Sequence, residues 1–75
     1  MWWYYIKKLE DEDKVIYLYG RETKIVSGEL IYNKKDQSYS VIKPADGDDQ
    51  AGWALQHLHD VIKAECPEEH MVAIG

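Results

Sequence analysis

Residues 14–19 read Lys-Val-Ile-Tyr-Leu-Tyr, and the last five of them form an unbroken apolar run. β-Branched and aromatic side chains of this kind favour a strand. Successive side chains of a strand point to opposite faces of the sheet, so Ile16 and Leu18 face one way and the alternate tyrosines face the other. An antiparallel sheet with one face in water alternates apolar with polar residues instead. This run therefore predicts a strand that needs apolar cover on both of its faces.

Three further strands are predicted around this one. Short polar turns at 10–13 and 33–36 join neighbours, so the four strands are expected to form an antiparallel meander. Pro44 ends the last of them because proline cannot donate to a strand ladder. Gly28 marks a weak point or a bulge in the third strand. The predicted strands cover residues 2–9, 14–19, about 23–32, and 38–43.

The period of the sequence changes after Pro44. Residues 46–49 read Asp-Gly-Asp-Asp and supply the capping oxygens and negative charge that favour the start of a helix. Apolar residues then recur at spacings of three and four, which places them on one stripe of a helix that runs to about Cys66. Pro67 ends the helix, and residues 70–74 are predicted to form a short final strand. The stripe consists of Ala51, Ala54, Leu55, Leu58, Val61 and Ile62.

These elements predict a single α+β domain over residues 1–75, with the order ββββαβ. The sheet is antiparallel, has four or five strands, and carries one helix on one face. The last strand can pair antiparallel with the first strand or parallel with the fourth. We favour the first placement because it puts the two most apolar strands in the interior of the sheet.

One helix can cover only one face of this sheet. The mainly aliphatic set is expected beneath it, namely Ile16, Leu18, Val26, Leu30 and Ile42. The opposite aromatic face would then be exposed, and exposed apolar patches rich in Tyr and Trp mark interaction sites. Trp53 lies opposite the helix stripe, where it either contacts a partner or folds under the preceding loop. The predicted partner-binding residues are Trp3, Tyr5, Tyr17, Tyr19, Tyr39 and Trp53.

Self-association is the simplest form of such docking, because symmetric pairs dominate among oligomers. The sequence therefore predicts a small protein-interaction or structural module that acts as a homo-oligomer or binds a protein partner. An acidic chain with a net charge of −5 argues against nucleic acid as that partner. No apolar run approaches the roughly 20 residues of a membrane span. Cys66 is the only cysteine, a usage that fits a reducing compartment, and we expect a soluble cytoplasmic protein.

Catalytic chemistry has little support in the sequence. Cys66 is expected at the end of a helix among Glu65, Glu68 and Glu69, where the negative charges oppose the reactive thiolate. No nucleophile–base constellation and no glycine-rich phosphate loop is recognisable. We therefore expect a protein that is not an enzyme and needs no cofactor. A small enzyme, or an accessory subunit of one, remains an alternative.

Metal or small-ligand binding is the first alternative. The candidate ligands are His57, His59, Cys66 and His70. Zinc accepts such a set, but two histidines two positions apart on a helix diverge by about 200° and do not readily share one ion. The sequence therefore predicts no metal site, and binding of a metal or small ligand by these residues is kept as the alternative to the protein-interaction function.

Leu58 lies at the centre of the predicted inner stripe, so its truncation tests the helix assignment. We expect Leu58→Ala to lower the free energy of unfolding by about 2–5 kcal/mol, the usual range for a buried leucine. Urea denaturation measures this change, and a fully stable variant would show that the inner face of the helix is wrongly placed.

Overall fold

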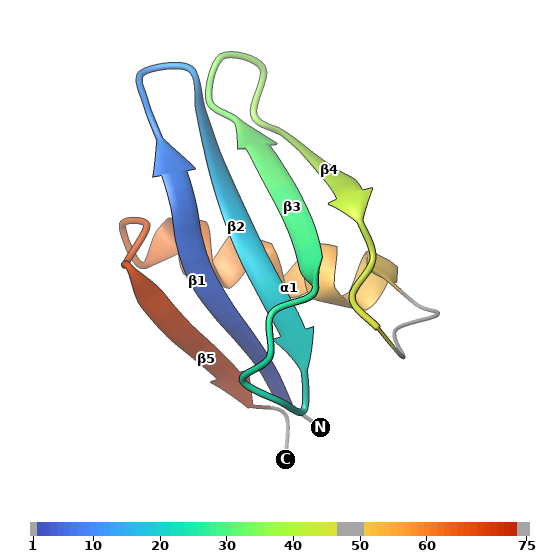
Figure 1. The fold of residues 1–75 in the computed structure, drawn as a ribbon. Helices are drawn as coiled ribbons and strands as arrows, with labels where there is room; N and C mark the ends of the chain where they lie inside the picture. Colours follow the sequence, from blue (N-terminus) through green and yellow to red (C-terminus); the bar gives the residue numbers. More distant parts are fainter. Residues whose placement is uncertain (1, 47–50, 74–75) are drawn as a thin grey trace.

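The computed structural model describes residues 2–46 and 51–73 of the 75-residue chain, with the backbone alone at 51–53. These residues form a five-stranded antiparallel sheet with one helix packed on one face (Figure 1). The predicted α+β order ββββαβ is confirmed. The elements are β1 (Trp2–Glu10), β2 (Lys14–Arg21), β3 (Gly28–Asn33), β4 (Ser38–Lys43), α1 (Ala51–Lys63) and β5 (Glu69–Ala73).

The strands lie in the order β4-β3-β2-β1-β5. The final strand pairs antiparallel with β1, so that Trp2 lies opposite Ala73 and Ile6 opposite Glu69. This confirms the placement that puts β1 and β2 inside the sheet. The helix crosses behind the strands from the β5 side to the β4 side (Figure 1).

Two predicted boundaries are shifted. The third strand begins at Gly28, because the chain first folds back onto the end of β2, where a Cβ on Gly20 would lie 2.5 Å from the carbonyl oxygen of Ile25. The helix ends at Lys63, three residues before Cys66, and Glu65 and Cys66 turn the chain with φ angles of 68° and 53°. The expected helix cap at 46–49 falls largely on residues 47–49, which lie outside the described part of the chain.

The expected assignment of the two sheet faces is wrong. The helix covers the aromatic face, and Trp3, Tyr5, Tyr17 and Tyr19 are each at most 1% exposed. They pack against the inner stripe of α1, in which Ala54, Leu58 and Val61 are fully buried. Of the aliphatic set expected beneath the helix, Leu30 is in this core, Ile42 is half exposed and Val26 lies in the loop before β3. Ile16 and Leu18 lie on the opposite face.

The tyrosine hydroxyls explain why the helix lies on this face. Tyr5 donates a hydrogen bond to the carbonyl of Ala54 in α1 at 2.8 Å. Tyr17 donates to the carbonyl of Pro67 at 2.6 Å, beyond the end of the helix. The hydroxyl of Tyr19 accepts a bond from the backbone N–H of Ala45 at 2.9 Å, ahead of the helix. Each phenol therefore fills the core with its ring and satisfies a backbone group of the helical layer with its tip.

Gly28 serves the Tyr19 contact and is not a bulge. The two residues are directly opposite in the β2–β3 ladder. A Cβ on Gly28 would lie 2.2 Å from the Tyr19 ring and 2.6 Å from the backbone nitrogen of Ala45. The ring therefore lies over the bare backbone of Gly28, and this position brings the phenol oxygen to Ala45.

Gly28→Ala tests this packing. We expect the free energy of unfolding to fall by about 1–3 kcal/mol, because the added methyl group displaces a buried ring that cannot move without breaking its hydrogen bond. Chemical denaturation measures the effect, and the exposed strand position Ser40→Ala is the control with little expected change. Equal stabilities of the two variants would contradict this account of Gly28.

Because Tyr17 is buried, we expect the stability of the protein to fall at alkaline pH. Burial raises the pKa of the Tyr17 phenol well above its usual range. The unfolded chain loses this proton near pH 10, while the folded chain keeps it, so the free energy of unfolding falls as the pH rises above about 10.

Tyr17→Phe removes this titration and the bond to Pro67. We expect it to lower the free energy of unfolding at pH 7 by about 0.5–1.5 kcal/mol, the net value of a typical hydrogen bond. Above pH 10 its stability should fall less steeply than that of the wild type. Denaturation curves from pH 7 to pH 11 measure both effects, and parallel pH profiles would contradict the assignment.

Candidate functional site

The face of the sheet opposite the helix is apolar and carries no secondary-structure element formed by the described residues. The ladder registers place its side chains, because directly paired residues share a face. Met71 is 49% exposed and Leu9 is 42% exposed, while the strand aliphatics between them are partly exposed. We call this surface the open face; its apolar residues are Trp2, Tyr4, Ile6, Leu9, Ile16, Leu18, Ile31 and Met71.

Charged side chains border the open face. The Lys8 ammonium on β1 lies 3.1 Å from the carboxylate of Glu29 on β3, so this ion pair crosses the central strand β2. The Lys24 ammonium lies 5.7 Å from the centre of the Tyr4 ring. The aliphatic stems of such lysines cover apolar surface while their charges stay in water. The cover is partial, since the residues of the open face keep the exposure described above.

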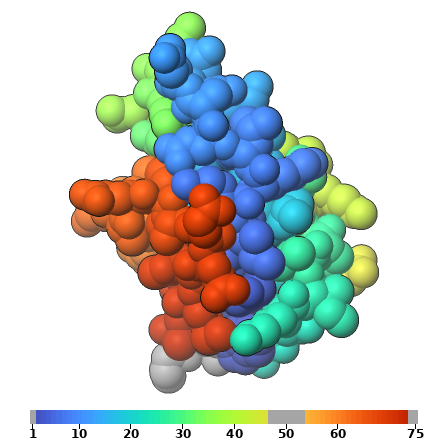
Figure 2. Space-filling model, turned by 60° about the vertical axis from the view of Figure 1, so that its left-hand side comes forward, coloured from blue at the N-terminus to red at the C-terminus, as the bar shows by residue number. Residues whose placement is uncertain are grey.

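Tyr4 is the one strongly buried residue of the open face, at 5% exposure. Its hydroxyl donates to the carboxylate of Glu69 on β5, and this hydrogen bond raises the pKa of Tyr4. Figure 2 shows β1 and β5 side by side at the surface, with the β2–β3 loop next to β1. The β2–β3 loop therefore covers the Tyr4 end of the open face, and β5 forms one side of the face.

The structure separates the residues that the sequence predicted to bind a partner. Trp3, Tyr5, Tyr17 and Tyr19 are in the core beneath the helix and do not reach the surface. Tyr39 is partly exposed on β4. The side chain of Trp53 lies outside the described residues.

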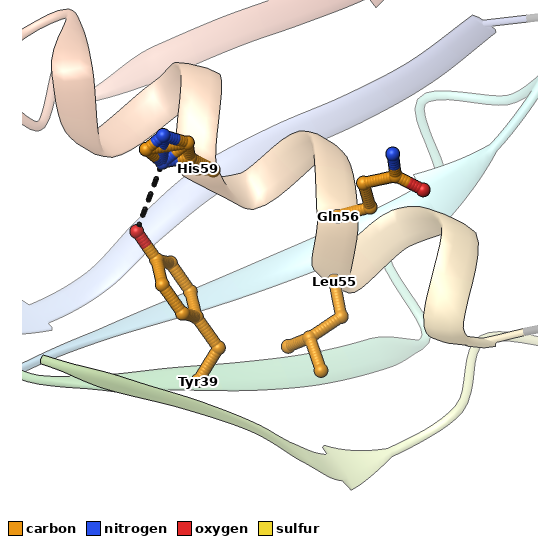
Figure 3. Close-up of a pocket in the computed structure, with 4 residues that line it drawn as sticks. All are labelled: Tyr39, Leu55, Gln56 and His59. Carbon is orange, nitrogen blue, oxygen red and sulfur yellow. Dashed lines mark hydrogen bonds between the residues drawn. The ribbon is translucent and has the colours of Figure 1, made fainter.

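Tyr39 lines a pocket between β4 and α1. The cavity has a volume of about 380 Å³, and its other lining residues, Leu55, Gln56 and His59, come from the helix. Figure 3 shows Tyr39 rising from the strand towards His59 and Leu55 pointing from the helix towards β4. The position at the outermost strand makes the pocket a groove along one edge of the sheet.

Tyr39 and His59 are joined across this groove. The hydroxyl oxygen of Tyr39 lies 3.2 Å from Nδ1 of His59, and the two rings are nearly perpendicular, with centres 6.0 Å apart. Burial raises the pKa of Tyr39, so its phenol keeps its proton, and the tautomer of the His59 imidazole determines which of the two groups donates. Tyr32 supports Tyr39 from β3, at a ring distance of 4.8 Å.

The four candidate metal ligands do not form a cluster. His57 lies against the Trp3 ring, whose centre is 6.4 Å away, whereas His59 contacts Tyr39. His70 lies on β5 opposite Tyr5, and Cys66 is partly buried after the helix, where burial raises the pKa of its thiol. Within residues 2–46 and 51–73, no group of three or more His, Cys, Asp or Glu side chains is placed to hold a metal ion.

None of the helical structure formed by the described residues is long and apolar enough to cross a lipid bilayer.

The sequence reasoning missed the residues that make both surfaces. The open face depends on Ile16, Leu18 and Ile31, of which the first two were expected beneath the helix. Leu55 was assigned to the inner stripe without its pocket, and Gln56 was not considered. The available signal was the polar tip of the tyrosines, which needs a hydrogen-bond partner when the ring is buried.

Comparisons with protein-family models, with curated proteins and with solved structures found no match to this chain. The functional interpretation therefore rests on the two surfaces themselves.

Proposed function

We propose that this protein is a self-associating interaction module and that two copies pack through their open faces. The observation that carries the proposal is the apolar composition of a sheet face that the β2–β3 loop and lysine side chains cover only in part. Contiguous apolar patches of more than a few hundred Å² usually mark interaction sites. The sequence-based prediction placed docking on the aromatic face, which the helix covers, and the surface of the present proposal is the opposite, aliphatic face.

The size of the face fits a symmetric pair. The two longer extents of the Cα trace are 31 and 21 Å, dimensions of the order that an interface of roughly 800 Å² per partner needs. Face-to-face packing of two sheets also provides the second apolar layer that a half-covered sheet lacks. The mechanism is burial of aliphatic side chains, and no bond is made or broken.

Charge placement favours a second copy as the occupant. Lys8 and Glu29 lie on opposite sides of β2 on the open face. A two-fold axis that runs along β2 in the plane of the interface brings Lys8 of one copy above Glu29 of the other. The ion pair between Lys8 and Glu29, which crosses β2 within one chain, can thus form between two chains instead. Leu18 and Ile16 of one copy can then pack against the same residues of the other copy across the axis.

Leu18→Lys tests the proposal. Leu18 lies on the central strand of the open face, and two lysines beside the axis would repel each other. We expect the wild type to sediment as a dimer at low micromolar concentration and Leu18→Lys to sediment as a monomer. The melting temperature of the wild type should also rise with protein concentration, because association stabilises the folded state.

Ala64→Lys is the matched control, since it adds the same charge at an exposed site after the helix, away from the open face. It should remain dimeric. Circular dichroism checks that Leu18→Lys is folded. A wild type that stays monomeric at tens of micromolar, or a dimer that persists in Leu18→Lys, would refute self-association through this face.

A further inference from the structure

A second surface lies at the β4 edge of the molecule, on the helix side of the sheet. It combines the groove lined by Tyr39, Leu55, Gln56 and His59 with the strand beside it. β4 is the outermost strand, and its outer edge pairs with no other strand in the described part of the chain. The backbone N–H and C=O groups along such an edge are a template for one more strand.

The first four residues of β4 lack the devices that usually protect an edge, whereas Lys43, the ladder irregularity after Val41 and Pro44 protect the end of the strand. Residues 38–42 read Ser-Tyr-Ser-Val-Ile, with neither charge nor proline, and the ladder irregularity falls only beyond Val41. The opposite edge strand differs, because β5 begins with Glu69, which accepts the Tyr4 hydrogen bond. Charged residues and proline are the common means by which proteins block pairing at an edge. The stretch from Ser38 to Val41 is therefore open to strand addition.

The groove provides what strand addition needs for specificity. In this mode the main chain supplies the hydrogen bonds, and pockets select alternate side chains of the added peptide. Side chains of an added strand that point to the helix side would enter the space between Tyr39 and Leu55, which is apolar at its base. The Tyr39–His59 bond fixes one end of this space.

The charge on the side of α1 that borders the groove indicates which peptides the groove would prefer. His59 and Lys63 lie one turn apart, so they share one side of α1. Lys63 is exposed and is in ion-pair distance of no described acidic side chain. The Lys63 ammonium is thus an unpaired positive charge among the described residues beside the groove, in a chain with a net charge of −5. Residues two positions apart on a strand point to the same face. An acidic side chain two positions from the apolar side chain in the pocket would therefore face His59 and Lys63.

We propose that this groove binds an extended acidic peptide segment of another protein, which adds to β4 as a sixth strand. One apolar side chain of the segment enters the pocket between Tyr39 and Leu55. An acidic residue two positions away lies against His59 and Lys63. The surface is distinct from the open face, so the two kinds of binding are independent.

Selection of a phage-displayed library of random ten-residue peptides on the immobilised full chain tests the proposal. The enriched sequences should contain an apolar residue with an acidic residue two positions away. A synthetic peptide of the enriched sequence should shift the backbone amide resonances of residues 38–41, together with those of Leu55 and His59. Library selection without enrichment, or shifts confined to the open face, would overturn the proposal.

Two variants make the test specific. Gln56→Trp fills the pocket from its exposed rim and should weaken binding of the selected peptide about tenfold or more, as expected when a central pocket is blocked. Ala64→Trp adds the same side chain outside the groove and should bind like the wild type. Lys63→Glu should weaken the peptide about threefold or more and reduce the salt dependence of binding. Fluorescence anisotropy of the labelled peptide measures all three, and equal affinities would refute the groove as the site.

Two further outcomes are decisive. Leu18→Lys should bind the peptide as the wild type does, so loss of self-association and loss of peptide binding are read separately. If the amide resonances of residues 38–41 instead shift with protein concentration in the absence of peptide, a second copy of the chain occupies the edge and the peptide proposal falls.

Discussion

The hydrogen bonds of three core tyrosines hold the helical layer to the sheet. Tyr19 bonds to the segment before α1, Tyr5 bonds to the first part of α1, and Tyr17 bonds to the segment after α1. Each bond is made to a backbone group. A phenylalanine would fill the same volume but would leave a backbone N–H or C=O without this partner, which is costly inside a protein. The chain contains six tyrosines and no phenylalanine. In this core the aromatic ring and the polar tip are both required.

This constraint determines what remains on the surface. Because the tyrosines lie beneath the helix, the alternate residues of the same strands point the other way, and these are Ile6, Ile16, Leu18 and Ile31. Between the helix and β4 a space remains, and Tyr39 and Leu55 border it. The open face and the groove are thus consequences of one packing arrangement. A single helix covers one face of β1, β2 and β3 and leaves two kinds of apolar surface uncovered.

The sequence was sufficient for the topology and insufficient for the orientation of the sheet. Residues 14–19 are apolar on both faces, which correctly indicated an interior strand and placed β5 beside β1. The limits of β4 were also predicted correctly, because polar turn residues and Pro44 bound it on both sides. The choice of the covered face failed because apolarity alone ranks Ile above Tyr. What decided it was the length of the tyrosine side chain and the backbone partner at its end, neither of which periodicity reports.

The candidate site was less predictable for the same reason. Tyr39 was expected on the face away from the helix, whereas it lies on the helix side, and its neighbours Leu55, Gln56 and His59 meet it only through the angle at which α1 crosses β4. That angle is fixed by the three phenol contacts, which connect residues about 26 to 50 positions apart. A pattern within a single segment contains no information about such distant pairs.

The pairing of β1 with β5 has a consequence for how the chain acquires its structure. Trp2 lies opposite Ala73. The pairing of β1 with β5 can therefore form only after almost all of the described residues have been synthesised. Closing so long a loop is entropically unfavourable, and folds dominated by such distant contacts form slowly. Until β5 arrives, β1 is itself an edge with an apolar side chain at most positions. The nascent meander is therefore most prone to aggregation just before completion, and conditions that slow the docking of β5 should affect yield more than final stability.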